Sequence, residues 1–499
     1  MSEIRRQSIL SSLFMYVGIA IGFVNITILF PVVLSSAQYG FTRWLLMIGS
    51  TLGLFAQLGI PSITYKFFPY FKDKDLKHNG YLSMALLLPL VGIGLACLVV
   101  FFFQDFIISK YSKPETLDIL IQYYWLLIPL TLFVVYYNIL NAYSTSLMRA
   151  SVPIFFRDVF VRLATLVILL LHYWKIIDFH GFIWAYTLIF GLQSIGLVIY
   201  LKSIGELQFN FDFRKIRSMK MELVKYGAYA LFSGGAAYVV SNIDGLMVSS
   251  LAAGQLQDLG IYSVFFFLGT VIMVPSKAIT SISLPVIAEG WKNNDLGRIG
   301  DVYKKTAITQ LVIGFFLFIL IWSNIDNFIA LLAWMGRPDY SAGKYVALYV
   351  GLAKLFDGAT GINGGIIVTS KYYRFDLFFV VGLIGLSVLT NYWFIPIYGI
   401  LGASIATAFT AFIYNLGKFL FVKNRFDLQP FSKETLLTIV VGLVVLGINY
   451  VLPALDNFML DVIYRSAILG ILYLVAVFYL RLSPDLNNAL TQVLKRFKQ

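Results

Sequence analysis

The stretch GLAKLFDGATGINGG, residues 351–365, carries a lysine and an aspartate within an apolar run that covers residues 343–369. An apolar run of about 20 residues or more is typical of a helix that crosses a membrane. A charge inside such a helix costs roughly 2.5–3.5 kcal/mol on insertion scales, so Lys354 and Asp357 must face protein or water. The stretch therefore predicts a membrane helix with one polar face.

The composition of the whole chain agrees with a membrane setting. Of the 499 residues, 59% are hydrophobic and 13% are charged, whereas soluble domains carry about 25% charged residues. No GxxxxGK[ST] loop occurs, and the connections between apolar runs are too short for a separate catalytic domain. Cys97 is the single cysteine, and the three histidines share no ligand spacing. We therefore expect no enzyme activity, no metal site and no cofactor.

Apolar windows predict an all-α polytopic protein with fourteen membrane spans. The predicted spans are residues 9–34, 41–65, 81–104, 119–147, 154–174, 181–203, 226–251, 259–287, 306–333, 343–369, 375–396, 400–422, 434–453 and 462–481.

Lysine and arginine predict the orientation of these spans, because cytoplasmic loops are enriched in both. With a cytoplasmic N-terminus, 28 of the 38 lysine and arginine residues fall on the cytoplasmic side. This set includes Lys418, Lys423 and Arg425 at the end of the twelfth span. We therefore predict that both termini are cytoplasmic. The net charge of +13 suits anionic lipid headgroups, and nucleic-acid binding is an unnecessary explanation.

Two pairs of short motifs suggest an internal repeat. AQYGF (37–41) matches LGIYS (259–263) at Gly40 and Gly260, and HGFIWA (180–185) matches YGILGA (398–403) at Gly181 and Gly399. The offsets are about 220 residues, which predicts two parallel six-helix lobes with a substrate path between them. The predicted divisions are an N-lobe (1–203), a cytoplasmic linker (204–225), a C-lobe (226–422), and two further helices with a cytoplasmic tail (434–499).

Three longer motifs carry a family resemblance. PIYGILGASIATAF (396–409), SNIDGLMVSSLAAGQLQDLGIYS (241–263) and SLPVIAEGW (283–291) resemble the polysaccharide-export branch of the MOP exporter superfamily, which contains Wzx-type oligosaccharide flippases, lipid II flippases and MATE drug exporters. The resemblance implies a MATE-like fold of two lobes around a central cavity, alternating access, and an undecaprenyl-diphosphate-linked glycan as cargo. It also implies a bacterial plasma membrane, with a polysaccharide polymerase and glycosyltransferases as candidate partners.

Polar residues share helix faces within the predicted spans, and such faces must meet protein or water. The candidate substrate-binding cations are Arg43, Arg162, Lys277 and Lys354. The candidate ion-coupling acids are Asp244 and Asp357, with a proton or sodium gradient as the driving force. Other polar residues expected in the cavity are Asn25, Gln57, Thr280 and Ser281. Because a diphosphate is an anion, buried arginine and lysine are suitable partners for it.

Each candidate also has a purely structural explanation. Lys354 and Asp357 are three residues apart and could neutralise each other, as could Asp158 and Arg162. Arg43 could extend to the membrane surface. Lys277 has no acidic residue within one helical turn, so a cavity or a partner on another span is needed.

Three classes of function follow from these observations: a flippase for a lipid-linked substrate, a small-molecule antiporter and a membrane enzyme. A flippase for a lipid-linked oligosaccharide is favoured. A MATE-type small-molecule antiporter is the alternative, although the first span offers Asn25 and no carboxylate. A lipid II flippase is disfavoured because the first span lacks a cationic cluster. A membrane polymerase or glycosyltransferase is a third class, which the short outer loops disfavour.

Overall fold

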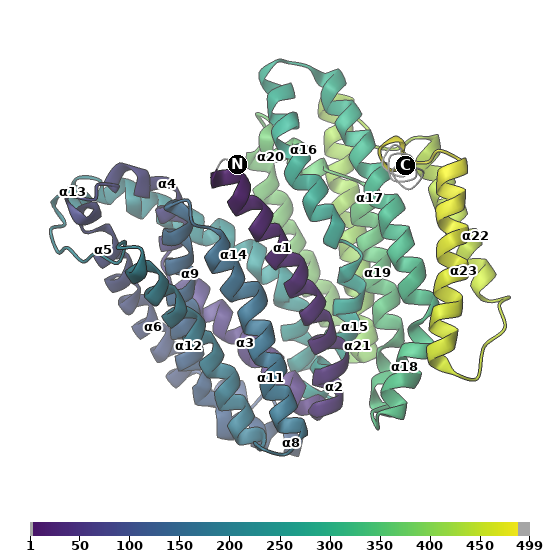
Figure 1. Ribbon diagram of the computed structural model, residues 1–499, viewed down its shortest axis with the longest axis horizontal. Helices are drawn as coiled ribbons and strands as arrows, with labels where there is room; N and C mark the ends of the chain where they lie inside the picture. Colours follow the sequence, from purple (N-terminus) through teal and green to yellow (C-terminus); the bar gives the residue numbers. More distant parts are fainter. Residues whose placement is uncertain (1–2, 488–499) are drawn as a thin grey trace. The chain divides into compact units, whose positions relative to one another are not determined.

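The computed structural model describes residues 3–487, and every regular element in this range is a helix. The helices form two compact units (Figure 1). The first unit extends to Ser250 and includes Gly254–Gly260, and the second comprises Leu251–Ala253 and continues from Ile261. The predicted lobes divide the chain earlier, in the loop 204–225, and that division stays a prediction. Residues 488–499 of the predicted tail lie outside the described residues.

The first unit is built from the following helices, with π-helical turns at Asn25–Leu29 and Phe155–Phe160. They are α1 (Glu3–Val24), α2 (Phe30–Val33), α3 (Ser36–Ala56), α4 (Ile60–Phe71), α5 (Tyr81–Leu87), α6 (Pro89–Phe102), α7 (Gln104–Ile108), α8 (Pro114–Tyr123), α9 (Leu127–Ser146), α10 (Ser151–Ile154), α11 (Val161–Tyr173), α12 (Phe179–Ser203), α13 (Arg214–Ser218) and α14 (Lys220–Leu251).

Helix α15 (Leu256–Val271) begins in the first unit and continues into the second. The remaining helices are α16 (Val274–Lys292), α17 (Leu296–Ser323), α18 (Ile325–Trp334), α19 (Lys344–Ala359), α20 (Asn363–Thr369), α21 (Arg374–Phe426), α22 (Lys433–Asn449) and α23 (Phe458–Tyr479). Short 3₁₀ turns lie at Lys77–Gly80, Tyr124–Leu126 and Pro338–Gly343.

The all-helical membrane fold is confirmed. Within residues 3–487, seven helices are long and apolar enough to cross a membrane, or ten if each bent pair forms one span. Each predicted span overlaps a helix or a series of consecutive helices, but the number fourteen stays a prediction. The single helix predicted at 306–333 is wrong. The chain breaks at Asn324, where the backbone leaves the helical conformation (φ −109°, ψ 9°) between α17 and α18.

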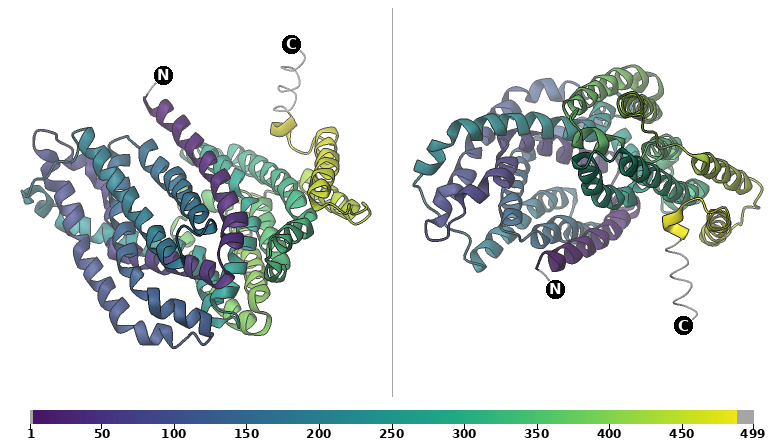
Figure 2. Two further views of the ribbon diagram at one scale, coloured as in Figure 1. Left: turned by 60° about the horizontal axis from the view of Figure 1, so that its bottom comes forward. Right: turned by 90° about the horizontal axis from the view of Figure 1, so that it is seen from above.

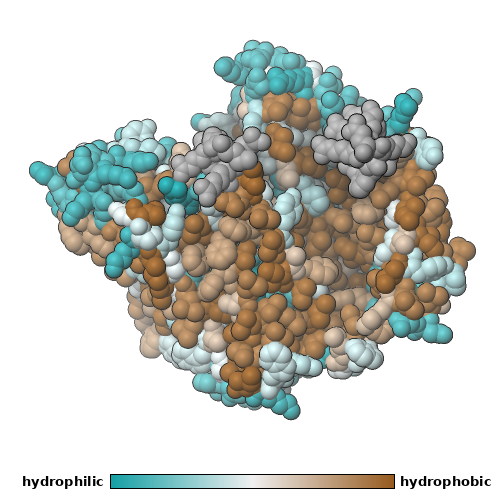
Figure 3. All heavy atoms as spheres, in the orientation of Figure 1, coloured by the Kyte–Doolittle hydropathy of each residue, from teal (hydrophilic) through white to brown (hydrophobic). Residues whose placement is uncertain are grey.

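Large apolar side chains cover much of the surface. Figure 3 shows apolar residues along the middle of the helices and hydrophilic residues at their ends. Phe102, for example, is 73% exposed, and many leucines and valines of α6 are exposed with it. Contiguous apolar surface of this extent is typical of contact with lipid. The chain is therefore a multi-pass membrane protein.

Two predicted spans are bent at related positions. Helices α3 and α4 meet at 41°, and α15 and α16 meet at 46°. The first bend contains Leu58 and Gly59 in left-handed conformations (φ 51° and 72°), and Pro275 follows the second. Proline at the first helical turn and glycine at φ > 0 are ordinary causes of such breaks.

The glycines that define the predicted repeat pack against each other. A Cβ atom on Gly40 would lie 1.7 Å from the carbonyl oxygen of Leu256, and one on Gly260 would lie 2.1 Å from that of Ser36. Each glycine therefore meets the residue four positions before its counterpart. This reciprocal contact has the symmetry expected of a repeat, because Gly40 and Gly260 are the same number of residues apart as Ser36 and Leu256. Only glycine allows the two backbones to approach this closely.

Gly399 divides α21 into two helices, as the predicted spans 375–396 and 400–422 require. Its backbone (φ 58°, ψ −135°) lies in a region that L-residues avoid. Figure 2 shows the two arms of α21 in green. They return side by side, with Thr390 and Thr410 in contact at 3.2 Å between their hydroxyl oxygens.

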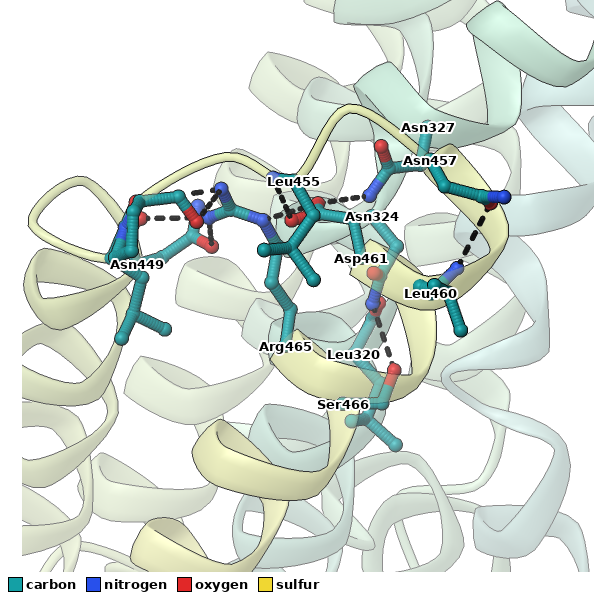
Figure 4. A network of polar contacts seen from close by, with 12 residues as sticks. Leu320, Asn324, Asn327, Asn449, Leu455, Asn457, Leu460, Asp461, Arg465 and Ser466 are labelled. Carbon is teal, nitrogen blue, oxygen red and sulfur yellow. Dashed lines mark hydrogen bonds and ion pairs between the residues drawn. The ribbon is translucent and has the colours of Figure 1, made fainter.

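A buried polar network joins α22 and α23 to α18 at one end of the second unit (Figure 4). Arg465 donates to Asp461 at 2.5 Å and to the carbonyl and side-chain oxygens of Asn449 at 2.9 Å. Asn327 of α18 donates to Asp461 at 2.6 Å. Further along α23, the Tyr473 hydroxyl donates to the backbone carbonyl of Val312 on α17 at 3.0 Å. Both charges of the Arg465–Asp461 pair are thus satisfied, and the pair fixes the connection between α22 and α23.

A second polar network connects two loops of the first unit. The imidazole of His78 is fully buried and donates to Glu206 at 2.9 Å, and Lys74 contacts the other carboxylate oxygen at 2.9 Å. The backbone carbonyl of Glu206 accepts from Tyr143 at 3.1 Å. Burial disfavours ionisation of Glu206, but the hydrogen bonds from His78 and Lys74 outweigh it and hold its carboxyl pKa below the ordinary value.

We predict that Glu206→Gln lowers the melting temperature of the detergent-purified protein at pH 7. The carboxylate with its lowered pKa stabilises the fold above its unfolded pKa of about 4.3, and this contribution is lost as pH falls through the folded pKa. The loss is about 1–3 kcal/mol at pH 7. The two proteins should converge below about pH 4, once the pH has fallen through the folded pKa, as measured by thermal unfolding across pH. An unchanged difference at both pH values would contradict an ionised role.

We also predict that Gly40→Ala and Gly260→Ala each destabilise the first unit, by about 1–3 kcal/mol, since their Cβ atoms would meet backbone oxygens. Gly94→Ala on α6 is the matched control, because a Cβ there meets nothing within 4 Å. This control should be neutral or stabilising by up to about 1 kcal/mol. Thermal unfolding measures all three, and equal melting temperatures would show that the contact is not tight.

Candidate functional site

The predicted site residues fall into two groups. Asn25, Arg43, Gln57, Arg162 and Asp244 belong to the first unit, and Lys277, Thr280, Ser281, Lys354 and Asp357 belong to the second. The prediction that all of them line one space therefore stays a prediction, and each group is described by its own contacts.

In the second unit, Lys354 and Asp357 pair on α19. The ammonium nitrogen lies 3.4 Å from one carboxylate oxygen, and the side chains are 25% and 30% exposed. Asn415 of α21 donates to the other carboxylate oxygen. Thr360 donates to the amide oxygen of Asn415 at 3.1 Å. Both oxygens of Asp357 are therefore engaged, whereas two of the three N–H bonds of Lys354 are not used in this pair.

Next to this pair lies a buried ion pair that we did not predict. Lys418 is 5% exposed, lies 2.9 Å from Asp376 and stands 4.4 Å above the ring of Tyr414. Lys418 lies inside the helix packing and not in a loop, and its assignment to the cytoplasmic side stays a prediction. The sequence contains one indication of this buried position. Lys418 lies three residues after Asn415, so the two side chains share one face of the helix.

A glycine leaves room for the Lys418 ammonium group. A Cβ atom on Gly364 of α20 would lie 3.1 Å from its nitrogen. The neighbouring Asn363 is 5% exposed, and its amide nitrogen is buried without an acceptor among the described residues. Helices α19, α20 and α21 therefore surround a polar interior that contains both ion pairs.

In the first unit, Arg162 of α11 lies over the glycines of α1. A Cβ on Gly18 would lie 2.8 Å from its Nη1 atom, and one on Gly22 would lie 3.1 Å from its Nε atom. Asp158 is 3.9 Å from Arg162 but 2.9 Å from Arg157. The carboxylate thus belongs mainly to Arg157, and Nη1 of Arg162 is buried without an acceptor among the described residues.

Both segments that meet at Arg162 contain π-helical turns. One turn begins at Asn25, which is 2% exposed and donates to the backbone carbonyl of Arg162 at 2.8 Å. The other turn, Phe155–Phe160, contains Asp158. Such turns widen a helix by one residue and are frequent at functional sites. The oxygen of the Asn25 amide is buried without a donor within residues 3–487.

Arg43 lies among aromatic hydroxyl groups in the same unit. It interacts electrostatically with Tyr39 and with Tyr186 of α12. The ring of Phe30 lies 4.7 Å from that of Tyr39 and 6.4 Å from that of Tyr186. The Nε atom of Arg43 is buried, and no acceptor for it exists in the described part of the chain.

Gln57 and Lys277 are separated by 220 residues. Gln57 is the C-cap of α3 at the first bend, and Lys277 lies in the first turn of α16, after the second bend. Gln57 is 8% exposed and accepts from Asn138 at 3.2 Å. Lys277 is exposed, and within residues 3–487 it forms no salt bridge or hydrogen bond. Near Lys277, Ser281 donates to the carbonyl of Ala278 at 2.8 Å, and Thr280 is half-buried.

These groups can bind and orient an anion. Asp244 is half-buried on α14. Among the described residues, no three histidine, cysteine, aspartate or glutamate side chains are grouped to hold a metal ion. What the arrangement offers is guanidinium and ammonium N–H groups in helix interiors, where desolvation strengthens their bonds to a charged acceptor.

Comparisons with known proteins agree with this description. A family model described as "Polysaccharide biosynthesis protein" matches residues 4–291. The search of curated proteins gives no match. Among solved structures, lipid II flippase MurJ in an inward closed conformation is similar with a TM-score of 0.71 and 16% identity, covering 95% of this chain and 99% of that one.

Two further solved structures show the same fold. An inward-facing MATE family multidrug resistance transporter of the MOP superfamily has a TM-score of 0.61 and 14% identity, covering 83% of this chain and 94% of that one. A MOP superfamily transporter from Pyrococcus furiosus has a TM-score of 0.51 and 15% identity, covering 85% and 95%. The chain belongs to the polysaccharide biosynthesis protein family and has the fold of MurJ and the MATE transporters.

Proposed function

We propose that this protein is a flippase for an undecaprenyl-diphosphate-linked oligosaccharide, which it moves from the cytoplasmic to the outer leaflet by alternating access. The family description supports a role in polysaccharide biosynthesis. The shared fold supports transport, because MurJ is named a lipid II flippase and the MATE proteins are named transporters.

One observation supports a cargo with an anionic headgroup. Arg43 and Arg162 each retain a buried guanidinium nitrogen without an acceptor among the described residues. A buried N–H group without a partner is costly, and a diphosphate supplies several charged acceptor oxygens. Lys354 adds an ammonium group that Asp357 only partly engages. Cations with spare donors suit a diphosphate better than they suit a cationic drug.

A MATE-type ion-coupled antiporter for small molecules is the second candidate, since the fold similarity includes such transporters. The family description favours the first. A polymerase or glycosyltransferase is a weaker proposal, because both comparisons lead to proteins that are not named as enzymes of that kind.

Ion coupling is a further part of the proposal. Asp357 is held by Lys354 and Asn415, so its protonation would remove the charge that attracts Lys354 and leave only the neutral hydrogen bond from Asn415. Asp244 is the other candidate acid. A proton or sodium gradient would drive transport through either carboxylate by changing its charge inside the membrane.

The protein would act in the bacterial plasma membrane with both termini in the cytoplasm. Glycosyltransferases that build the lipid-linked glycan and a polymerase that consumes it are the expected partners. No nucleic-acid partner is proposed.

We predict that deletion of the gene causes undecaprenyl-linked oligosaccharide to accumulate on the cytoplasmic side, and that Lys354→Ala fails to restore export. Lys354→Arg should restore it partly, since a diphosphate accepts either cation. The double variant Lys354→Ala/Asp357→Ala leaves no buried charge unpaired, so it should be stable yet inactive. Export is measured as surface glycan, and stability as protein abundance with thermal unfolding.

The matched control is Lys344→Ala/Asp326→Ala, which removes an ion pair of 2.5 Å that includes the first residue of the same helix. This control should export normally. Near wild-type export by the Lys354/Asp357 double variant would show that the pair stabilises the fold and does not bind the cargo. If no lipid-linked glycan accumulates in the deletion strain, the proposed cargo is wrong.

We predict the topology from labelling in a Cys97→Ser background, which removes the single native thiol. A cysteine at Asp456, between α22 and α23, should react with a membrane-impermeant maleimide in intact cells. A cysteine at Ser203, at the end of α12, should react only after permeabilisation. Both positions are exposed. Labelling of Ser203→Cys from outside would invert the proposed orientation.

A further inference from the structure

A pocket of about 570 Å³ lies in the second unit, where the ends of α16 and α21 meet the turn between α20 and α21. It is away from the ion pairs described above, since none of their residues contributes to it. The lining residues are Trp291, Asn294, Leu296, Lys371, Tyr372, Asn424, Arg425, Phe426 and Asp427. The proposed transport mechanism assigns no role to this pocket.

Two cations in the pocket share one aromatic ring. The Lys371 nitrogen lies 5.3 Å from the centre of the Tyr372 ring, and the Arg425 guanidinium carbon lies 5.5 Å from it. Among the described residues, neither cation forms a salt bridge. A tyrosine face attracts a cation by about 0.5–1 kcal/mol at an exposed site, but it carries no charge that would offset the repulsion between two cations.

The position at a helix end explains only one of these cations. Arg425 lies in the last turn of α21, where the partial negative charge of the helix C-terminus stabilises a cation. Lys371 precedes α21 and follows the end of α20 at Thr369, so it belongs to no last helical turn. Lys371 directly precedes Tyr372 in the chain, whereas Arg425 reaches the same ring from the end of α21.

Aromatic rings form the wall beside these cations. The ring centroids of Trp291 and Phe426 are 4.7 Å apart, and those of Tyr372 and Phe426 are 5.7 Å apart. The indole nitrogen Nε1 of Trp291 is buried and has no acceptor among the described residues. An unused indole N–H donor next to two unpaired cations makes a site for an acceptor that carries negative charge.

The charge around the pocket favours an anion. A second pocket of about 490 Å³ shares Leu296 and Asp427 with the first and adds Lys304 and Lys423 as cations and Asp301 as an acid. Four cations against two acids thus surround the end of α21. The apolar rings on one side would accept a ring or an acyl chain that the anion carries.

We propose that this pocket binds the phosphate group of an anionic ligand, held between Lys371 and Arg425, with the Trp291 N–H as a further donor. Arginine and lysine are the usual partners of phosphate oxygens. Two sources share this chemistry: the headgroup of an anionic phospholipid and a soluble phosphate or diphosphate. Binding at this site does not require the protein to transport a glycan, so its test is independent of the proposed function.

The test uses the full chain in nanodiscs of phosphatidylcholine, titrated with inorganic pyrophosphate and followed by calorimetry. Lys371→Gln/Arg425→Gln should weaken binding by about tenfold or more, as expected for the loss of charge-assisted hydrogen bonds. The matched control is Lys292→Gln/Lys433→Gln, which removes two exposed cations that do not line the pocket. It should bind pyrophosphate within about twofold of the wild type. Equal melting temperatures verify that each variant is folded.

A second arm distinguishes the sources. Native mass spectrometry of the protein with phosphatidylglycerol counts retained lipids in the wild type, the pocket variant and the control. If only the pocket variant loses the retained lipid, and the wild type does not bind pyrophosphate, the site binds a lipid headgroup. If the wild type binds pyrophosphate saturably and only the pocket variant loses this binding, the site binds a soluble phosphate. If the pocket variant and the control bind both probes alike, the proposal is wrong.

Discussion

Inside a membrane no water is available to solvate a charge, and the second unit is organised around that constraint. Among the described residues, Asp357 and Asp376 each meet a partner from another helix or from the other arm of α21. Asp357 pairs with Lys354 and accepts a hydrogen bond from Asn415, and Asp376 pairs with Lys418. Because these partners lie on α19 and on both arms of α21, satisfying the charges also fixes the helices. Breaking one pair would leave a buried charge, which is costlier than removing both.

The first unit satisfies its acids in the same way but not all its bases. Asp158 has two arginine neighbours, at 2.9 and 3.9 Å. Arg162 and Arg43 each keep a buried nitrogen without an acceptor in the described residues. A membrane protein has little reason to retain such groups for stability alone, since each costs free energy. This surplus of donors is the observation on which the proposed binding of an anion rests.

The sequence predicts the helices better than it predicts their partners. Long apolar runs and Gly399 place most helix ends, because both act locally. Lys418 is predicted only as a cytoplasmic-side charge at the end of the twelfth span, because a hydropathy window detects an apolar run and not the partner of a charge within it. Its partner Asp376 lies 42 residues away in the chain, and Asn415 lies 58 residues from Asp357. Periodicity can place residues on one face of a helix, but it cannot say which helix that face meets. The break at Asn324 depends on one backbone conformation, which a window of apolar residues does not encode.

The two halves of the repeat share backbone features but differ in one polar side chain. Gly40 and Gly260 are both retained, because each must admit the other's backbone, and the bends after α3 and α15 are retained with them. At the two bends the polar residue differs: Gln57 is buried against Asn138, and Lys277 is exposed, with no bond to another side chain in residues 3–487. A neutral amide needs only a hydrogen bond, whereas a lysine in the same place needs water or an anion. The backbone thus keeps its symmetry for packing, while at this pair of positions only Lys277 carries a charge.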